Sequence, residues 1–539
     1  MALASFDFAI AIGGEAGQGI ATPGDILARI FVRRGLHLNT YNAYQSIIRG
    51  GHIFLYVRVC DQEIHTHGDK LDLLVCLNQD TMDRHLQLMG PGSAVLYNGD
   101  NITPGEAADG VQMCPLPVAE LSNTRNRLSQ NTMAVGSAAY LLGLDFEVLE
   151  ESLTLRFQRQ GQAVIDENVG VARAGYDHAA ANFKAFAQTV PTGPKPLAVW
   201  SGNDALAMGG AAAGVKFYAA YPMSPATGVL HWMAQNARNL GIMVRQVEDE
   251  IGVANMVIGA AHTGCRSMCA TSGGGFALMT EAVGAAAMME IPSVFINVQR
   301  AGPSTGVPTK TEQGDLWQSL GASQGDFERF IVAPLNSLDC FNVMPELFNL
   351  TDKYQCPGIV LSDLLLAEGR FSVDPDLIDM HPKIDRGELI TKPSATDGYL
   401  RYKDTDSGIS PRALPGLEGY VHMVVTDEHD ENSSLISDEF TNPHKRRKMV
   451  EKRGRKFKPA IKDIKAPELE GAADADITLV GWGSSYGVIK EAVDILAQQG
   501  VAANHLAIKW IVPFHGEEIT EILSKCKRVV IVENNYSGQ

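Results

Sequence analysis

Between residues 198 and 300 the sequence alternates strand-like and helix-like segments, and this alternation limits the possible folds more than any other feature. Short apolar runs such as "LAVW", "KFYAA" and "PSVFIN" are each followed by a helix-length stretch. Alternation at this spacing predicts a parallel sheet joined by crossover helices. Because those stretches are rich in glycine and alanine, we expect the helices to pack closely against the sheet.

Further α/β patterns flank this region. The chain begins with a buried-strand pattern, "FDFAIAI" (6–12), followed by a glycine-rich turn and an apolar-periodic helix. Three prolines in "VPTGPKPLA" predict a linker, and a smaller strand–glycine–helix pattern starts at residue 475. We predict a multidomain α/β protein with these parts: domain 1–189, linker 190–197, domain 198–425, charged connector 426–474 and domain 475–539.

Composition excludes several classes of function. The net charge of −17 argues against a general nucleic-acid-binding protein. The eight cysteines include no CxxC pair, so the chain has no iron–sulfur or zinc framework of its own. No stretch is apolar for long enough to span a membrane, and the first residues read as a strand rather than a signal peptide. Scattered cysteines are typical of a reducing cytosol, so we expect a cytoplasmic protein.

Two features near the end of the chain complete the organisation. An acidic run at 427–439 precedes a basic run at 444–458. We interpret the basic run as a solvated, salt-bridged helix rather than a nucleic-acid site. The final "VVIVENNYSGQ" reads as a strand running into a loop, and we expect the native chain to continue beyond it.

The glycine-rich turn is the first candidate site. Gly14, Gly17 and Gly19 do not have the G-x-G-x-x-G spacing of dinucleotide-binding folds. Glycines permit tight turns and close backbone approach, and the following helix N-terminus attracts anions. Two interpretations stay open: a turn required for packing, and a neighbour of a phosphate or pantetheine group.

The loop "YPMSP" is the second candidate. Tyr221 and Ser224 each precede a proline, which disfavours helix and stiffens the loop. A hydroxyl held there, at the carboxyl end of a strand, lies where α/β sheets bind ligands. The alternative is that Ser224 is a helix N-cap.

Charged residues supply the remaining candidates. Glu248, Asp249 and Glu250 open an otherwise apolar helix, and acidic residues in a first turn usually offset the helix dipole. A glutamate on the buried side could instead bind a protonated ligand nitrogen. Arg300 follows a strand and could bind a carboxylate in a bidentate manner, or pair with a structural acid.

These motifs together resemble the 2-oxoacid:ferredoxin oxidoreductase family, and in particular an α subunit with the γ domain fused at its N-terminus. The resemblance covers essentially the whole chain. It is carried, in order, by "GGEAGQG", "SIIRGGH", "SGNDALAMGGAAAG", "YPMSPATG", "VEDEIGVANMVIGA", "TSGGGFALM", "GPSTGVPTKTEQGDL", "GWGSSYG" and "VVIVENNYSGQ". It implies a γ-type α/β domain, a thiamine diphosphate pyrimidine-type parallel-sheet domain, and a smaller transketolase C-terminal-like domain.

The resemblance also implies roles for single residues. Glu250 would hydrogen-bond the aminopyrimidine of thiamine diphosphate, and Arg300 would bind the substrate carboxylate, which makes both catalytic. The family's Tyr-Pro-Ile-Thr-Pro motif has Ser224 in place of threonine here, which keeps the donor but loses the methyl group that restricts its rotamer. The remaining implied contacts are Tyr221, Pro222, Ser224, Pro225, Thr309 and Lys310 for the substrate, Ser272 and Gly273 for the cofactor, and Gly14, Gly17, Gly19 and Arg49 near coenzyme A.

Two family features are missing from this sequence. There is no Gly-Asp-Gly segment of the Mg²⁺–diphosphate signature and no cysteine set for a [4Fe–4S] cluster. The family carries both on a β subunit, so the resemblance implies that this chain is active only with that partner. The implied assembly is a heterotetramer, (αβ)₂, that binds a 2-oxoacid, coenzyme A and ferredoxin.

The substrate is expected to be 2-oxoglutarate, because "GPSTGVPTKTEQGDL" resembles that branch of the family most. A second substrate carboxylate needs a second cation, for which Lys310, Arg49 and His52 are candidates, with a cation of the β subunit as an equal alternative. Pyruvate or a branched-chain 2-oxoacid is the alternative. Two other hypotheses remain: a transketolase-type thiamine enzyme without ferredoxin, and a non-catalytic scaffold in which Glu250 and Arg300 are structural.

Overall fold

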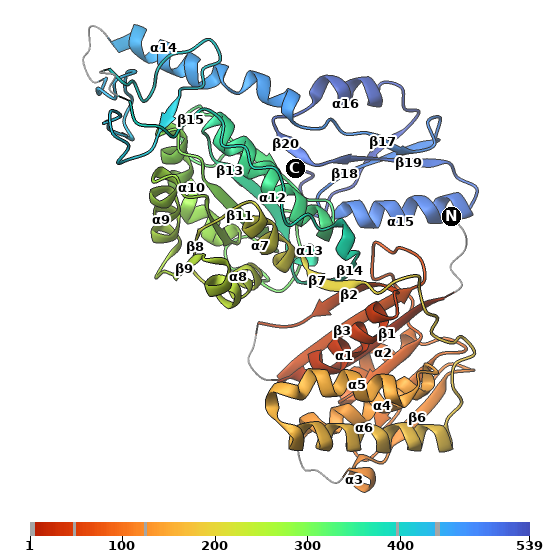
Figure 1. Ribbon diagram of the computed structural model, residues 1–539. Coiled ribbons are helices and arrows are strands. Elements are labelled where there is room, and N and C mark those ends of the chain that lie inside the picture. The colour runs from red at the N-terminus through yellow and green to blue at the C-terminus, as the bar shows by residue number, and fades with distance from the viewer. Residues whose placement is uncertain (1–5, 47–49, 123–126, 395–397, 437–441) are drawn as a thin grey trace. The chain divides into compact units, whose positions relative to one another are not determined.

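The computed structural model describes residues 6–46, 50–122, 127–394, 398–436 and 442–539 (Figure 1). The chain divides into two compact units. Residues 1–200 with 369–377 form unit 1, and residues 201–368 with 378–539 form unit 2. Within the described ranges, no helix is both long and apolar enough to cross a membrane.

Unit 1 is built on an eight-stranded sheet with the order β6-β5-β4-β1-β3-β2-β14-β7. β1 runs antiparallel to β3 and parallel to β4, and β5 and β6 continue the parallel part. The strands are β1 (Asp7–Ala16), β2 (His37–Ala43), β3 (Gly50–Cys60), β4 (Leu73–Cys76), β5 (Ala94–Asn98), β6 (Gln112–Leu116), β7 (Ala198–Ser201) and β14 (Arg370–Val373). The main helices are α1 (Ala21–Arg33), α2 (Gln79–His85), α4 (Arg127–Leu141), α5 (Phe146–Phe157) and α6 (Gln162–Asn182).

The first strand is longer than the sequence predicts. The prediction that it ends at residue 12 is wrong, because Gly13 and Gly14 pair with Phe54 and Ile53 on β3. The glycines therefore continue an antiparallel ladder before the chain turns at 17–20 into α1.

Unit 2 contains a seven-stranded sheet with the order β20-β12-β13-β11-β10-β8-β9, in which only β20 is antiparallel to its neighbour. The alternation in the sequence correctly predicts this parallel sheet. The strands are β8 (Phe217–Ala220), β9 (Met243–Gln246), β10 (Ser267–Thr271), β11 (Val294–Gln299), β12 (Phe330–Val332), β13 (Gly358–Asp363) and β20 (Trp510–Val512). The helices are α7 (Gly202–Ala212), α8 (Thr227–Leu240), α9 (Glu250–His262), α10 (Gly273–Met288), α11 (Leu316–Leu320), α12 (Ser337–Tyr354) and α13 (Leu364–Glu368).

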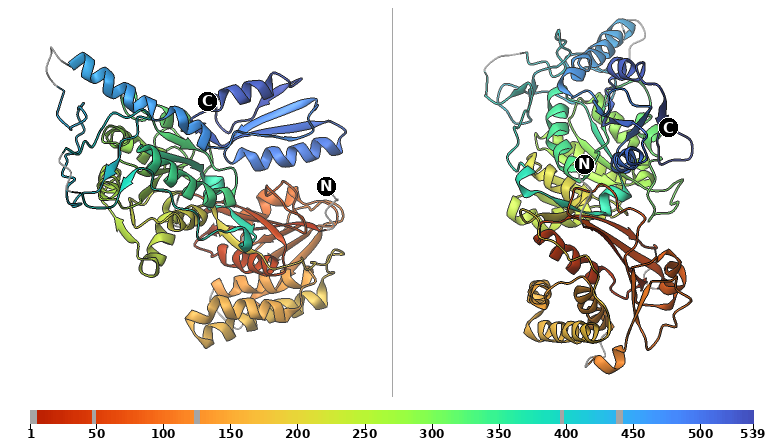
Figure 2. Two further views of the ribbon diagram at one scale, coloured as in Figure 1. Left: turned by 45° about the horizontal axis from the view of Figure 1, so that its top comes forward. Right: turned by 90° about the vertical axis from the view of Figure 1, so that its right-hand side faces the viewer.

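Helices cover both faces of this sheet (Figure 1, Figure 2). Met268 and Cys269 are neighbours on β10 and therefore point to opposite faces. Met268 lies against Gly210 of α7, where an added Cβ would come within 2.8 Å of its sulfur. Cys269 contacts Met279 of α10 at 4.0 Å between the sulfurs. The small residues thus allow the close helix–sheet packing expected from the sequence.

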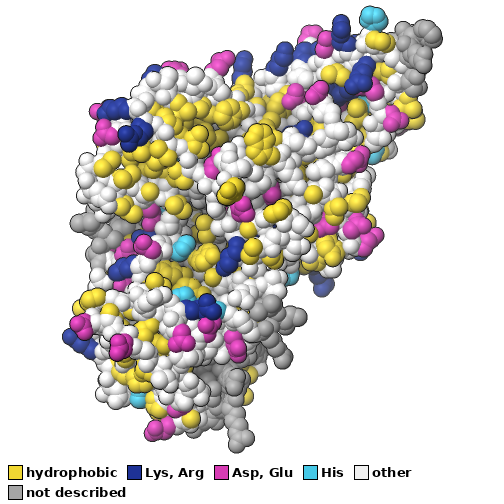
Figure 3. All heavy atoms as spheres, turned by 180° about the vertical axis from the view of Figure 1, so that it is seen from behind, with side chains coloured by type: hydrophobic (Ala, Val, Ile, Leu, Met, Phe, Trp, Pro, Cys, Tyr) yellow, Lys and Arg dark blue, Asp and Glu magenta, His cyan; other side chains and the backbone are white. Residues whose placement is uncertain are grey.

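A smaller sheet near the end of the chain has the order β17-β19-β18-β21. It consists of β17 (Leu469–Gly471), β18 (Ile477–Trp482), β19 (Ala503–Ile508) and β21 (Val529–Ile531), with helices α15 (Ser485–Gln498) and α16 (Gly516–Leu523). We call residues 475–539 the C-terminal module. Hydrophobic side chains gather over it in Figure 3, and the edge strand β21 leaves all three of its residues exposed.

The basic run forms α14 (Asn442–Arg455), and its outer residues behave as predicted. Lys445 pairs with Asp430, and Lys448 pairs with Glu431, both in the acidic run. The prediction of a solvated helix is wrong for the C-terminal part of the run. Lys452 and Lys456 are buried and both bind the carboxylate of Glu290, at 2.6 and 3.0 Å, because this buried acid requires compensating cations.

Candidate active site

The predicted site residues of unit 2 follow four neighbouring strands. The loop at 221–225 follows β8, Glu250 follows β9, Ser272 follows β10 and Arg300 follows β11. Parallel strands end at the same edge of a sheet, so these residues are brought to one side of it.

The "YPMSP" loop is non-helical, as its prolines predict. Its backbone is held at two points: Asn203 Nδ2 donates to the Pro225 carbonyl at 2.8 Å, and Arg300 Nη1 donates to the Ser224 carbonyl at 2.7 Å. The N-cap alternative for Ser224 is excluded, because α8 begins after Ala226. The side chains of Tyr221 and Ser224 are exposed.

Glu250 is the buried member of the acidic run. Asp249 caps α9 by accepting a hydrogen bond from Gly252 N at 2.7 Å, and Glu248 is exposed. Glu250 is only 3% exposed, and its Oε1 has no hydrogen-bond partner among the described residues. A buried carboxylate oxygen without a partner is costly, which indicates that a ligand satisfies it.

Gly275 makes room for this carboxylate. A Cβ at Gly275 would lie 2.6 Å from Glu250 Oε1 and 2.1 Å from Thr271 Oγ1. Any side chain there would displace both groups. The third glycine of "SGGG" therefore has a steric role at the site.

Two further unpartnered polar atoms belong to Ser272, which follows β10, and to Asn297, which lies on β11. Ser272 Oγ and Asn297 Oδ1 are both buried and have no hydrogen-bond partner within the described ranges. Ser272 precedes α10 without capping it through its side chain. Together with Glu250 Oε1, these atoms provide a set of donors and acceptors suited to a polar heteroaromatic group.

Asp315 joins the site through the loop after Arg300. Its carboxylate accepts a hydrogen bond from Asn297 Nδ2 at 3.2 Å, and its backbone N–H donates to Gln299 Oε1 at 3.0 Å. A Cβ at Gly273 would lie 2.5 Å from Asp315 Oδ2. Asp315 in "TEQGDL" and Asn297 in "PSVFIN" were not predicted as site residues. Their contact depends on tertiary structure, which the sequence pattern does not display.

Burial raises the pKa of the Asp315 carboxyl to about 6, an effect that the Asn297 hydrogen bond opposes. The folded chain therefore binds this proton more tightly than the unfolded chain. The resulting stabilisation is complete below pH about 4 and is lost as the pH rises through about 6.

The Asp315→Asn side chain cannot ionise. We therefore expect the stability of this variant, relative to that of the unmodified protein, to increase as the pH rises. The relative gain in unfolding free energy between pH about 4 and about 8 should approach ~3 kcal/mol. Denaturant unfolding across this pH range measures it. A stability difference that is independent of pH would contradict the shifted pKa.

The loop after Arg300 folds back on itself. Ala301 N donates to the Lys310 carbonyl at 3.0 Å, and Lys310 N donates to the Val307 carbonyl at 3.0 Å. Thr309 is buried at 4% exposure, whereas the Lys310 side chain is exposed. The structure therefore places Thr309 inside the folded loop and leaves Lys310 available at its surface.

The glycine turn lies in unit 1. Gly17 and Gly19 have φ values of 93° and 78°, so this turn favours glycine for backbone reasons. A cavity of about 340 Å³ lies at the ends of β4 and β5, and Gln18, Asn78, Asn98 and Asn131 line it with uncharged amides. Arg49 lies outside the described residues.

His52 is a candidate cation for the second substrate carboxylate, and its surroundings do not favour a permanent positive charge. Its Nε2 lies 2.8 Å from His85 Nε2, and its Nδ1 lies 3.7 Å from Asp80. Burial lowers the pKa of His52. It is therefore a poor choice for a permanent positive charge.

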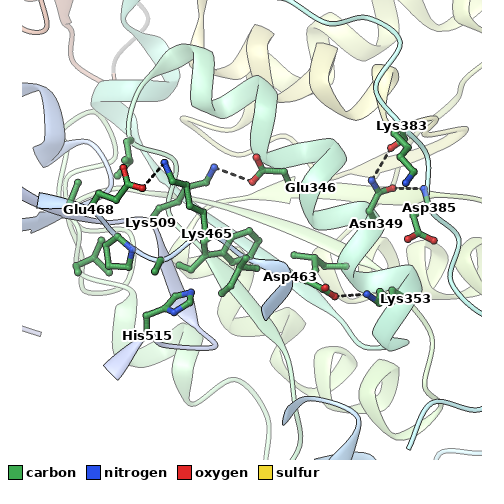
Figure 4. A pocket seen from close by; sticks show the side chains of 18 of the residues that line it. Glu346, Asn349, Lys353, Lys383, Asp385, Asp463, Lys465, Glu468, Lys509 and His515 are labelled. Carbon is green, nitrogen blue, oxygen red and sulfur yellow. Dashed lines mark hydrogen bonds and ion pairs between the residues drawn. The ribbon is translucent and has the colours of Figure 1, made fainter. Parts of the chain in front are cut away.

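A cavity of about 630 Å³ elsewhere in unit 2 contains many charged side chains (Figure 4). Most of them pair with one another: Lys353 with Asp463 at 2.5 Å, and Lys509 with Glu346 at 3.0 Å. None of the predicted site residues that the structure describes lines this cavity. Its charge is largely satisfied internally, so it is not the candidate active site.

Comparison with known proteins finds relatives that match nearly the whole chain. Three family profiles match: "Pyruvate ferredoxin/flavodoxin oxidoreductase" over residues 9–178, "Pyruvate flavodoxin/ferredoxin oxidoreductase, thiamine diP-bdg" over 208–452, and "Pyruvate:ferredoxin oxidoreductase core domain II" over 475–539. The α subunit of 2-oxoacid:ferredoxin oxidoreductase 2 from Aeropyrum pernix is 31% identical, over 99% of this chain and 92% of the relative. The 2-oxoglutarate oxidoreductase subunit KorA from Mycobacterium tuberculosis is 30% identical, over 98% and 85%.

A solved structure is also similar. The 2-oxoglutarate:ferredoxin oxidoreductase from Magnetococcus marinus, with 2-oxoglutarate, coenzyme A and succinyl-CoA bound, is 32% identical. The match has a TM-score of 0.91 and covers 99% of this chain and 93% of that chain.

Proposed function

The chain belongs to the 2-oxoacid:ferredoxin oxidoreductase α subunits, and from this membership we propose that it converts 2-oxoglutarate and coenzyme A to succinyl-CoA and CO₂, passing two electrons to ferredoxin. Membership makes it a subunit of a thiamine diphosphate-dependent oxidoreductase. The choice of 2-oxoglutarate is supported by the names of the KorA relative and of the solved structure. Pyruvate and branched-chain 2-oxoacids are the alternatives that the experiment below distinguishes.

The buried Glu250 carboxylate is the observation that carries the proposal. The unpartnered Oε1 of Glu250, whose carboxylate occupies the space that Gly275 leaves, and the unpartnered Ser272 Oγ fit the aminopyrimidine of thiamine diphosphate. When bound, the cofactor supplies the electron sink for decarboxylation. Glu250 would hold a proton between its carboxyl and the pyrimidine nitrogen, and Ser272 and Gly273 would contact the same group.

Substrate binding is assigned to the loops after β8 and β11. Arg300 already holds the Ser224 carbonyl, so its guanidinium is oriented across the "YPMSP" loop. We infer that it binds the 2-oxoacid carboxylate, with Tyr221, Pro222, Ser224, Pro225 and Thr309 shaping the site. The exposed Lys310 is the described cation that we assign to the distal carboxylate of 2-oxoglutarate.

The proposed division of the chain follows the sequence prediction: a γ-type domain at 1–189, a linker at 190–197, a pyrimidine-type domain at 198–425, a connector at 426–474 and a C-terminal domain at 475–539. Coenzyme A is assigned to the glycine turn of the first domain (Gly14, Gly17 and Gly19), with Arg49. The uncharged amides beside Gln18 suit the amide groups of its pantetheine arm.

A β subunit is proposed to complete the site. Three large apolar side chains on helices α9 and α10 are exposed: Ile251 (52%), Met256 (47%) and Leu278 (52%). We infer that these exposed apolar side chains belong to the interface with that partner. This partner would hold the Mg²⁺, the diphosphate and the [4Fe–4S] cluster in an (αβ)₂ assembly. A cytoplasmic location remains a prediction from the scattered cysteines.

The test is anaerobic co-purification of the chain with its partner, followed by viologen reduction. We expect reduction with 2-oxoglutarate that requires coenzyme A, and at most weak reduction with pyruvate or 2-oxoisovalerate. Reduction with another 2-oxoacid would keep the reaction and change the substrate. No reduction by an intact brown complex would instead favour a scaffold.

A further inference from the structure

The last residues of the C-terminal module bind the loop that follows Arg300. Gln313 N donates to the Asn534 carbonyl at 2.7 Å, and Asn535 Nδ2 donates to the Gln313 carbonyl at 3.1 Å. From the other side, Gln313 Nε2 donates to the Trp482 carbonyl at 3.1 Å. Both backbone groups of Gln313 are therefore held by residues more than 200 positions away along the chain.

Gln539 holds the next part of the loop with both ends of its amide. Its Oε1 accepts from Leu316 N at 3.1 Å and from Trp317 N at 3.4 Å. Its Nε2 donates to the Gly314 carbonyl at 3.0 Å. A neutral amide can accept and donate in this way, whereas a carboxylate has no donor.

Asn535 shapes the segment that presents Gln539. Its Oδ1 accepts from Gly538 N at 2.7 Å and from Gln539 N at 3.3 Å, which closes a tight turn. Its Nδ2 also contacts Glu533 Oε2 at 2.6 Å. The Asn535 side chain thus orders the turn and binds the loop at the same time.

Asp315 lies between the residues that are held in this way. Its carboxylate meets Asn297 and closely approaches Gly273, at the proposed cofactor site. On both sides of Asp315 the backbone binds the two amide side chains: Asn535 binds the Gln313 carbonyl, and Gln539 binds the Gly314 carbonyl and the Leu316 and Trp317 N–H groups. The Asp315 N–H itself donates to Gln299 on β11, and its carbonyl accepts from Ser319 N. Small shifts of a residue beside reacting groups have large kinetic effects.

We propose that Asn535 and Gln539 are positioning residues, whose amides hold residues 313–317 so that the Asp315 carboxylate lies against Asn297 and Gly273. This role rests on the proposed function for its catalytic consequence. The "NNYSGQ" segment thereby acts on a site formed by other parts of the chain.

The test uses the complete complex and combines amide hydrogen exchange with kinetics. In Gln539→Leu both the acceptor for the Leu316 and Trp317 N–H groups and the donor to Gly314 are lost, so the Leu316 and Trp317 amides should exchange at least about tenfold faster, and kcat/KM for the 2-oxoacid should fall about tenfold. Asn535→Ala should give the same two changes. Tyr536→Ala is the matched control, because Tyr536 lies in the same segment with its ring fully exposed.

The outcomes separate this role from the proposed function. Unchanged exchange in Gln539→Leu overturns the inference, as does faster exchange with unchanged kcat/KM. If Asn535→Ala fails to assemble, Gln539→Leu decides, since it nearly keeps the size of the side chain. If the unmodified complex reduces no acceptor with any 2-oxoacid, the proposed function fails, and the exchange result alone decides whether these amides hold the loop.

Discussion

Glu250→Gln is expected to lower kcat of the reconstituted complex by about 10³-fold, within the range found when a positioned acid or base is removed. The glutamine keeps the size of the side chain and fills the space beside Gly275, so folding should be preserved. It removes the carboxyl that would exchange a proton with the cofactor. Steady-state viologen reduction measures the loss, and thiamine diphosphate affinity, followed by calorimetry, reports whether binding weakens as well.

Glu248→Gln is the matched control for this experiment. Glu248 belongs to the same acidic run but is exposed. The two variants change charge equally, so a general electrostatic effect would lower both activities alike. Full turnover in Glu250→Gln would show that the buried carboxylate is structural, and would support the scaffold hypothesis.

Arg300→Lys is expected to raise KM for the 2-oxoacid by about 30-fold, which corresponds to ~2 kcal/mol for a lost charged hydrogen bond. Lysine keeps the charge but cannot reproduce the planar, two-point contact with a carboxylate. It also loses the geometry that now holds the Ser224 carbonyl. The measurement is the dependence of viologen reduction on 2-oxoacid concentration, with coenzyme A saturating.

Arg245→Lys provides the control, because Arg245 is an exposed arginine on the edge strand β9. It should leave KM unchanged. If Arg300→Lys also leaves KM unchanged, the arginine pairs with a structural group and does not bind substrate. Since KM and kcat are read separately, an effect confined to kcat would point to a role in the chemical step instead.

The sequence alone was sufficient to predict the parallel sheet of unit 2 and the edge at which its candidate site residues lie. Strand–helix alternation requires crossover connections, and these bring the ends of β8, β9, β10 and β11 to one edge. The prolines of "YPMSP" likewise determine a non-helical loop through local sterics. These features depend on short-range patterns, which a sequence displays directly.

Tertiary structure decided which charged groups are buried and which polar groups meet. Glu250 and Glu248 are two residues apart, but Glu250 is buried with its carboxylate against Gly275, whereas Glu248 is exposed. Tertiary packing also buries Lys452, which binds Glu290 at a separation of 162 residues along the chain. Local composition does not distinguish a solvated lysine from one that compensates a buried acid.

The contact between Gln539 and the loop around Asp315 is the clearest case of this kind. It joins residues 225 positions apart through one side-chain amide. No periodicity or composition signal predicts such a pairing, because its free energy depends on the geometry of two separately folded segments. Sequence determined the elements and the edge where they end, and the tertiary structure determined which groups meet there, since long-range hydrogen bonds form only after those elements have packed.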